Sequence, residues 1–424
     1  MNKNNISAEL SLQNAECRTL KNGVKLYSLA CNEFEVVRVS FVYGAGSVMQ
    51  NTPFSATATA NMMYEGSRDM TSTQIAEKLD YYGSYFDVNI DRDYSYISFC
   101  SLSKFVKPTL EVAEQIILYP TFPEEELITY RNKRKQRLAI ERQKVETRAR
   151  EAFAKSLFGE EHPYGISSDE KEYDNLTRED LIHIYNRLYI ASNCFVVVSG
   201  KITDEVLELV ERVASEIPQG EVSQDKNIVA VDFPEPQQRH YHLVEKADAV
   251  QSSIRIGRLL FTRTHPDFVG MQVLATILGG YFGSRLMKTL REERGYTYGV
   301  MSAMVNFAKS GYFAVATQVG VEVVDDALNL IYEQIELLRN EVVSDEELNM
   351  VKRIMIGEIM RILDGPFGVA DVTIENILCE RTNDAIAQNV EQIEAITAEE
   401  LIVLAKKYLA FDYLVTVVSG SHIR

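Results

Sequence analysis

The sequence lacks the cysteine patterns that mark disulfide-rich and zinc-binding domains. Its five cysteines, Cys17, Cys31, Cys100, Cys194 and Cys379, are odd in number and widely spread, and no two form a C-x-x-C pair. This distribution excludes a disulfide framework and a zinc knuckle, and it is typical of reduced, partly buried thiols in a cytosolic protein. We therefore expect a cytoplasmic location.

Long apolar runs and several common catalytic motifs are also missing. The N-terminus has no apolar h-region, so we expect no signal peptide in the sequence as given. No run approaches the roughly 20 apolar residues that a membrane-spanning helix needs, so we expect no membrane partner. There is no G-x-S-x-G elbow of a serine hydrolase and no G-x-x-x-x-G-K-[ST] phosphate loop.

Positive charge is scarce. The chain has 44 Lys and Arg residues against 61 Asp and Glu residues, which gives a formal net charge of −17. This balance argues against binding to nucleic acid or to an anionic membrane surface. It would suit a basic peptide, although net charge reports on solubility before it reports on partners.

The sequence contains an internal repeat. At 424 residues the chain is long enough for two domains. L-T-x-E-x-L at 176–181 matches I-T-x-E-x-L at 396–401, and V-V-S-G at 197–200 recurs at 417–420, both 220 residues later. E-E-L at 125–127 recurs at 346–348, 221 residues later. A nearly constant offset at three separate places predicts a duplicated domain.

The pattern of elements predicts the fold class of each half. Strands and helices are mixed without strict alternation, which indicates an α+β fold with a largely antiparallel sheet packed with helices. We place the N-terminal domain at 1–217, a linker at 218–237 and the C-terminal domain at 238–424, because the middle segment has linker composition. One long charged helix is expected from 124 to about 157.

The most informative stretch is 279–300. Glycines supply a loop at 279–283, Ser284 is placed to cap a helix, and Gly295 is placed to end that helix in the left-handed conformation. A strand is then expected from residue 296. Arg291 therefore falls in the last helical turn and Tyr298 on the strand just after it, so that a guanidinium and a phenol can be aimed at one point.

With this stretch, which reads L-R-E-E-R-G-Y-T-Y-G-V over 290–300, the duplicated α+β chain resembles the pitrilysin/insulysin superfamily of zinc peptidases. The likeness is greatest to the mitochondrial processing peptidase-like branch, and it covers essentially the whole chain. It implies a mitochondrial processing peptidase/LuxS-like metallohydrolase fold. It also implies that Arg291 and Tyr298, which have the superfamily's spacing of seven residues, bind the substrate. An arginine fork and a tyrosine hydroxyl can together stabilise the oxyanion that forms on attack.

The zinc motif of the superfamily is missing. In these peptidases H-x-x-E-H precedes a segment like M-L-F-x-G-T, which M-M-Y-E-G-S at 62–67 matches. The resemblance then puts Thr57 and Asn61 at the histidine positions and Ala60 at the catalytic glutamate. A hydroxyl and a neutral amide are poor zinc ligands, and alanine offers no base. The third ligand position falls around 138–141. Glu141 is a candidate relic there, although a solvated face of the charged helix explains it better.

Three functional hypotheses remain open. In the first, the chain is the zinc-free, substrate-binding subunit of a heterodimeric metallopeptidase. It would supply Arg291 and Tyr298 while a homologous partner with an intact H-x-x-E-H holds the zinc, and it would not hydrolyse peptides alone. In the second, the chain is a non-enzymatic scaffold or binding protein of the same fold. In the third, it is an enzyme with an unrecognised site that uses His240 and His242, which share one face of a probable strand.

Overall fold

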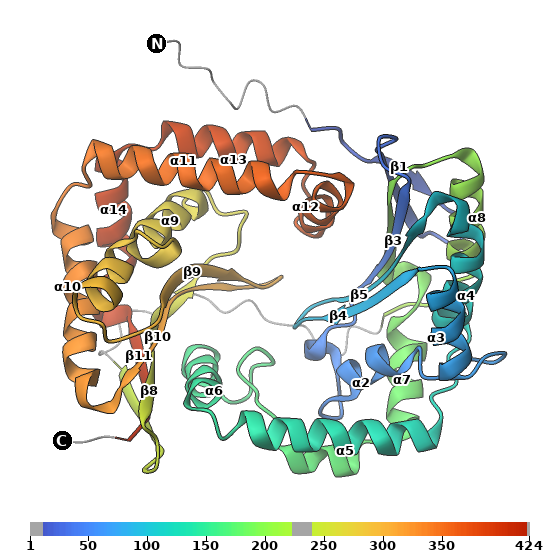
Figure 1. The fold of residues 1–424 in the computed structure, drawn as a ribbon, viewed down its shortest axis with the longest axis horizontal. Helices are drawn as coiled ribbons and strands as arrows, with labels where there is room; N and C mark the ends of the chain where they lie inside the picture. The colour runs from blue at the N-terminus through green and yellow to red at the C-terminus, as the bar shows by residue number, and fades with distance from the viewer. Residues whose placement is uncertain (1–11, 223–239, 422–424) are drawn as a thin grey trace.

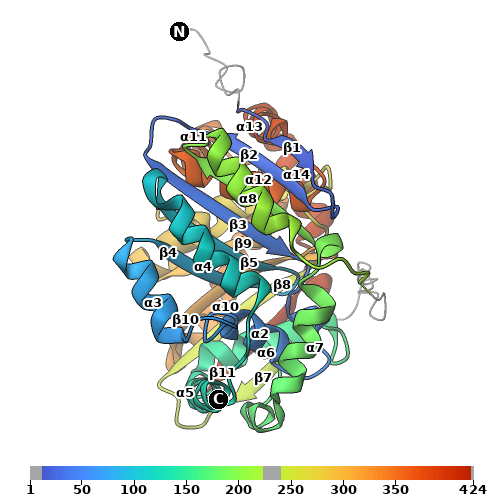
Figure 2. The same cartoon turned by 90° about the vertical axis from the view of Figure 1, so that its right-hand side faces the viewer.

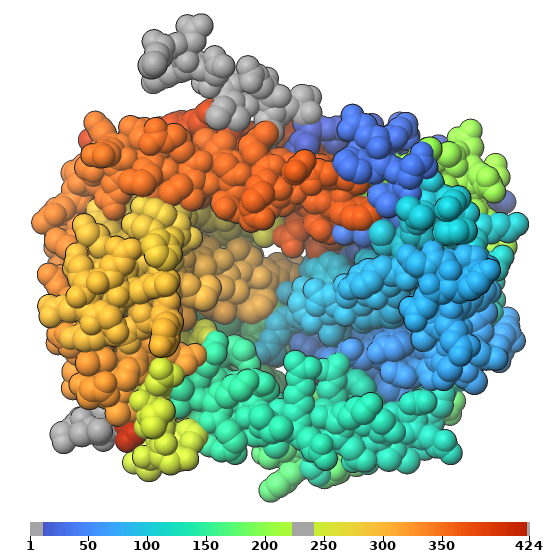
Figure 3. All heavy atoms as spheres, viewed as in Figure 1, coloured from blue at the N-terminus to red at the C-terminus, as the bar shows by residue number. Residues whose placement is uncertain are grey.

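The computed structural model describes residues 12–222 and 240–421. These residues form two halves that face each other across a hollow centre (Figures 1 and 3). Each half is built on one sheet, and most of its helices lie on the side of the sheet away from the centre. In the first half, α3, α4 and α8 cover this outer side (Figure 2).

Within residues 12–222, the first half combines a six-stranded sheet with seven α-helices. The strands run in the order β1-β2-β6-β3-β5-β4. They are β1 (Glu16–Thr19), β2 (Lys25–Ala30), β3 (Val36–Tyr43), β4 (Tyr85–Ile90), β5 (Ser95–Leu102) and β6 (Cys194–Gly200). The helices are α2 (Ser55–Met62), α3 (Ser72–Tyr81), α4 (Val106–Leu118), α5 (Glu124–Glu141), α6 (Val145–Phe158), α7 (Arg178–Leu188) and α8 (Asp204–Ser215).

The second half has the same plan. Its five strands run in the order β7-β11-β8-β10-β9. They are β7 (His240–Glu245), β8 (Gln251–Leu260), β9 (Val300–Asn306), β10 (Gly311–Gly320) and β11 (Val415–Gly420). The helices are α9 (Phe268–Ala275), α10 (Val324–Asn340), α11 (Asp345–Ile362), α12 (Pro366–Leu378), α13 (Asp384–Ala395) and α14 (Ala398–Tyr408).

The two sheets repeat one topology. The order β2-β6-β3-β5-β4 corresponds to β7-β11-β8-β10-β9. In each sheet the first of these pairs is parallel and the other neighbours are antiparallel. The predicted α+β class with largely antiparallel sheets is therefore confirmed. The proposed domain boundaries stay a prediction, and residues 223–239 of the linker region lie outside the described residues.

The repeated sequence motif marks a repeated helix start. Thr177 accepts a hydrogen bond from the backbone N–H of Asp180, whose carboxylate accepts one from the backbone N–H of Thr177. Thr397 and Glu400 form the same capping box at the start of α14. A capping box satisfies two backbone donors that the helix itself leaves unpaired. The 220-residue repeat thus preserves local structure as well as residue type.

The predicted single helix over 124–157 is wrong. The chain leaves the helical conformation at Lys144 (φ −79°, ψ 132°), so α5 and α6 are separate. The break allows α6 to cross to the other half, where it packs against β8 and β11. In return, α12 packs against β6 and β2 of the first half. The two halves therefore exchange one helix each. No glycine or proline marks the break, so the sequence pattern gave no sign of it.

The exchanged α6 brings an apolar cluster to the junction of the halves. Phe153 of α6 lies edge-to-face with Tyr312 of β10, with 5.9 Å between ring centroids. The buried cluster also includes Ala149 from α6 and Val417 from β11. A polar contact lies beside it, because Asp93 accepts hydrogen bonds from the Tyr164 hydroxyl at 2.6 Å and from the backbone N–H of Ala308 at 2.8 Å.

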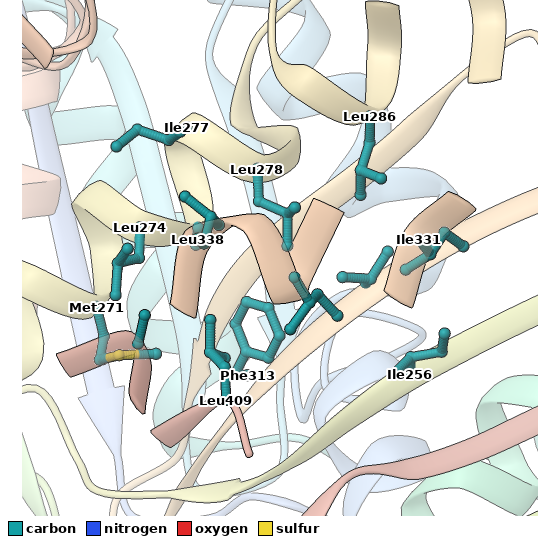
Figure 4. Close-up of a cluster of buried hydrophobic side chains, with 14 of the residues drawn as sticks. Ile256, Met271, Leu274, Ile277, Leu278, Leu286, Phe313, Ile331, Leu338 and Leu409 are labelled. Carbon is teal, nitrogen blue, oxygen red and sulfur yellow. The ribbon is translucent and has the colours of Figure 1, made fainter. Parts of the chain in front are cut away.

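The core of the second half holds the 279–300 stretch in place. Leu286 and Leu290 are completely buried and belong to the cluster that contains Phe313 and Ile331. Figure 4 shows Leu286 pointing from its segment toward Ile331 and Leu278. The predicted apolar face of this helix is therefore the side that anchors the segment to the core.

Candidate functional site

The degenerate zinc motif lies on α2, a short helix whose buried positions are mostly small. Ala60 is completely buried, whereas Thr57 and Asn61 are half-buried and stand one turn apart. The Asn61 amide donates to the backbone carbonyl of Thr57 at 2.7 Å, as a hydrogen bond within the same turn. The two positions are therefore neighbours on one helix face, as two ligands of a helical metal motif would be.

An arginine occupies the space beside Asn61. Arg134 of α5 donates from Nη2 to the Oδ1 of Asn61 at 3.1 Å. Its guanidinium also lies 5.1 Å from the ring centre of Tyr130. Burial raises the pKa of Tyr130, and the charge of Arg134 opposes that rise. Both the NH2 group and the carbonyl oxygen of the Asn61 amide are thus hydrogen-bonded. Arg134 also places a permanent positive charge beside Asn61, and this charge would repel a divalent cation.

The positions around the expected third ligand do not supply one. Leu138 packs against the core of the first half. Glu141 is only partly exposed and pairs with Lys144 at 2.7 Å, and this hydrogen bond lowers the pKa of the Glu141 carboxyl. Thr57 and Leu138 both line a cavity of about 380 Å³. The residues at the motif do not fit zinc, because one offers a hydroxyl, one an amide and one no donor at all.

The rest of the described chain offers no alternative metal site. Across residues 12–222 and 240–421, no group of three or more His, Cys, Asp or Glu side chains is arranged to hold a metal ion. β7 starts at His240 and includes His242, as expected, but the side chain of His240 lies outside what the structure describes. All five cysteines are unpaired.

The stretch that carries Arg291 differs in detail from the prediction. Residues Met287–Glu293 form a π-helical segment, wider than the α-helix expected. The hydroxyl of Ser284 is buried without a hydrogen-bond partner within the described residues, so its predicted capping role is wrong. Gly295 has φ +66°, which confirms the predicted left-handed end of the helix. The N–H of Tyr296 then donates to the carbonyl of Leu290 at 2.8 Å.

Tyr298 lies in a loop and not on a strand. β9 begins only at Val300, four residues later than predicted. The hydroxyl of Thr297 donates to the Gly299 carbonyl at 2.8 Å and accepts from the Gly299 N–H at 3.1 Å, which ties the loop into a local turn. This local hydrogen bonding competes with the ladder and explains why the strand starts late.

Arg291 and Tyr298 are both exposed. Tyr298 is 91% exposed, and the Arg291 guanidinium stacks at 4.8 Å on the ring of Phe282, itself 61% exposed. In the part of the chain that the structure describes, no hydrogen bond or ion pair uses the Arg291 side chain, and none joins it to Tyr298. The structure therefore leaves both groups accessible to a ligand, and their convergence on one point stays a prediction.

A bidentate ion pair anchors the base of this segment. The Nε and Nη2 of Arg285 donate to the two carboxylate oxygens of Glu347 on α11, at 2.9 and 2.7 Å. Both side chains are only about one-fifth exposed. Such a fork-to-fork pair fixes orientation as well as position. Arg285 is therefore committed to structure, in contrast to Arg291.

The chain is similar to known proteins along its whole length. Residues 175–355 match the family described as "Peptidase M16 inactive domain". An uncharacterized zinc protease of Bacillus subtilis, YmxG, is 20% identical over 95% of this chain and 98% of its own. A second B. subtilis protein, described as the probable inactive metalloprotease YmfF, is 23% identical over 39% of this chain and 38% of its own. The crystal structure of a peptidase M16 inactive domain from Pseudomonas fluorescens superimposes with a TM-score of 0.87 at 24% identity, covering 97% and 99% of the two chains.

These findings define an inactive metalloprotease-like protein. The match of residues 175–355 and the relatives' names confirm the resemblance to the pitrilysin-like M16 superfamily inferred from the sequence, and the chain lacks the zinc motif of that superfamily. In the described residues, no helix combines the length and the apolar character needed to cross a bilayer.

Arg134 is the site residue that the sequence analysis missed. It lies on a helix with nine charged residues among eighteen, so its charge alone did not distinguish it. The only sequence signal was its place one helical turn before Leu138, near the position expected for the third ligand. Helical periodicity from that position would have placed Arg134 on the same face as the lost site.

Proposed function

We propose that this chain is the zinc-free, substrate-binding subunit of a heterodimeric metallopeptidase. Its role would be to hold an extended peptide and to supply Arg291 and Tyr298 to a site whose zinc lies on a homologous partner. The observation that carries this proposal is the accessibility of the pair. Arg291 and Tyr298 are exposed, whereas Arg285 of the same segment is held in an ion pair.

The surface around the pair supports contact with another molecule. Phe282 and Met301, which flank the segment, are 61% and 57% exposed. Exposed aromatic and methionine side chains next to an arginine are the residue types that dominate binding hot spots. A guanidinium supported on an aromatic ring can also reach a carbonyl oxygen without first breaking an internal ion pair.

A free sheet edge supports peptide binding. β4 is the last strand of the first sheet, with β5 on one side and no strand of the described chain on the other. Its residues alternate between exposed and half-buried. An edge strand presents unpaired backbone donors and acceptors, to which an extended peptide can add as a further strand. In Figure 1, β4 and β5 extend toward the hollow centre from one side as β9 does from the other.

The proposal is tested by reconstitution. The chain is mixed with a homologous subunit from the same organism that carries an intact H-x-x-E-H, and hydrolysis of a basic peptide is measured. Loss of one oxyanion donor typically lowers kcat by about 10²–10³-fold. We therefore expect Arg291→Ala to show such a loss and Tyr298→Phe a smaller one. Arg294→Ala, an exposed arginine three residues away, serves as the matched control and should keep its rate.

Complex formation and zinc content of the partner are measured in parallel, so that a failure to assemble is recognised. If Arg291→Ala and Tyr298→Phe assemble and retain full activity, the pair has no catalytic role. The chain would then be a non-enzymatic scaffold of the same fold. If the isolated chain binds zinc stoichiometrically and hydrolyses peptides, the proposal of a zinc-free subunit is refuted.

A further inference from the structure

Three arginines from separate elements gather around one tyrosine near the junction of the halves. Arg92 lies between β4 and β5, Arg150 on α6 and Arg255 on β8. All three act electrostatically on Tyr312 of β10. Burial lowers the pKa of Arg92 and of Arg255, and the positive charge of Arg150 lowers both further. Arg150 is therefore close enough to both Arg92 and Arg255 to repel each of them.

The carboxylates near this cluster are already occupied. Glu151 accepts a hydrogen bond from Arg142 at 3.3 Å. Glu146 accepts one from the amide of Gln318 at 3.0 Å. Asp93, the third neighbour, accepts from Tyr164 and Ala308 as described above. None of these acids forms an ion pair with the three arginines.

The positive charge is thus uncompensated by direct contacts. Within the described residues, no side-chain hydrogen bond or ion pair involves Arg92, Arg150 or Arg255, and the Nε of Arg255 is buried without a partner. Arg92 and Arg255 are half-buried, whereas Arg150 is exposed. Half-buried charges without a partner are unfavourable unless an opposite charge is bound beside them. The chain has a net charge of −17, so acidic side chains are plentiful, yet none forms an ion pair with these three arginines within the described residues.

A cavity provides the space for such a charge. Arg92 and Arg150 line the cavity of about 380 Å³ on which Thr57 also opens. Its wall includes Asn51, Ser167 and Ser168, whose side chains can donate hydrogen bonds. The only carboxylate in the lining belongs to Glu151, which Arg142 already holds. This volume lies within the range of small-ligand pockets.

We propose that this cavity binds an oxyanion, a phosphate or a carboxylate group, held by Arg92 and Arg150, with Arg255 adding to the positive field. Guanidinium groups pair with such anions through two parallel hydrogen bonds. The site is a property of this chain alone and does not depend on a zinc-bearing partner. Thr57 stands at a position where the superfamily binds a metal cation, but here it borders a cavity that would bind an anion.

The test is calorimetric titration of the full chain with inorganic phosphate at constant ionic strength. A short peptide is titrated in a second arm, once with a free C-terminal carboxylate and once amidated. We expect saturable binding of phosphate, and at least a tenfold loss of affinity in Arg150→Gln. Arg353→Gln on α11 is the control, because it removes the same charge from an exposed arginine outside the cavity, and it should bind as the wild type does.

The two arms identify the source of the anion. If only the peptide with a free carboxylate competes with phosphate, the site accepts a peptide terminus, whereas competition by neither peptide indicates a small free anion. If Arg150→Gln does not fold, Arg92→Lys replaces it, since lysine keeps the charge but loses the fork and should still weaken binding. The absence of saturable binding, or equal affinity in the cavity variants and in the control, would overturn the proposal.

Discussion

The exchange of α6 between the halves leads to a quantitative prediction for Phe153→Ala. Phe153 is 2% exposed and lies in the apolar cluster that joins α6 to the second sheet. Truncation of a buried phenylalanine to alanine typically costs about 3–5 kcal/mol through lost transfer energy and the cavity left behind. The edge-to-face contact with Tyr312 adds about 0.5–1.5 kcal/mol.

We therefore expect Phe153→Ala to weaken the junction by about 4 kcal/mol while leaving the two separate cores intact. Differential scanning calorimetry should then show the unfolding endotherm broaden or divide into two transitions, because the halves no longer unfold together. Far-UV circular dichroism at low temperature should remain that of the wild type, since neither sheet is damaged.

Phe313→Ala is the matched control. Phe313 is completely buried in the core of the second half and does not belong to the junction cluster. The same truncation there should lower the stability of the second half itself, and so lower the transition temperature with loss of its secondary structure. If Phe153→Ala unfolds in one transition at the wild-type temperature, α6 does not couple the halves and our interpretation of the exchange is wrong.

Three further variants test other features. Burial raises the pKa of Asp93 above 3.8, so as pH falls the folded protein binds a proton at this carboxylate before the unfolded chain does. The stability of the wild type relative to Asp93→Asn should therefore increase from pH 7 to pH 4. Chemical denaturation measures this difference, and a decrease would contradict the raised pKa. Gly295→Ala should lower the free energy of unfolding by about 1 kcal/mol, because φ at this position is +66°. The cost is conformational and not steric, since no atom lies within 4 Å of the new methyl group. An unchanged transition temperature would show that the segment adapts. Arg285→Ala should cost about 2 kcal/mol, between values for exposed and buried pairs, and Arg285→Lys should recover only part of it.

The sequence was sufficient for the fold class and the repeat. Both depend on local signals, such as alternating strands and the threonine caps at Thr177 and Thr397, which the structure reproduces in both halves. The left-handed Gly295 was likewise predictable, because few other residues adopt that conformation without strain.

The predictions that were wrong concern features that tertiary or side-chain contacts decide. The break between α5 and α6 has no glycine or proline, and it exists because α6 packs on the other half. The late start of β9 reflects side-chain bonds of Thr297 that compete with the strand ladder. A propensity pattern contains neither kind of information.

The candidate site was predicted only in part. The loss of ligands at Thr57, Ala60 and Asn61 followed from the resemblance, which placed these positions at the zinc motif, and from their residue types. The placement of Arg134 beside Asn61, and the gathering of Arg92, Arg150 and Arg255, join residues far apart in the chain. Charged residues on solvated helices look alike in a sequence, so only the fold distinguishes them. The convergence of Arg291 and Tyr298 on one substrate stays a prediction.

The reciprocal crossing of α6 and α12 also bears on the origin of the molecule. A polypeptide of half this length would leave an apolar helix and a sheet face uncovered, and two copies would cover both through twofold pairing. The chain is thus equivalent to such a pair fused end to end. Once fused, the copies no longer have to share a sequence, so an arginine-rich cavity can evolve in one copy without appearing in the other.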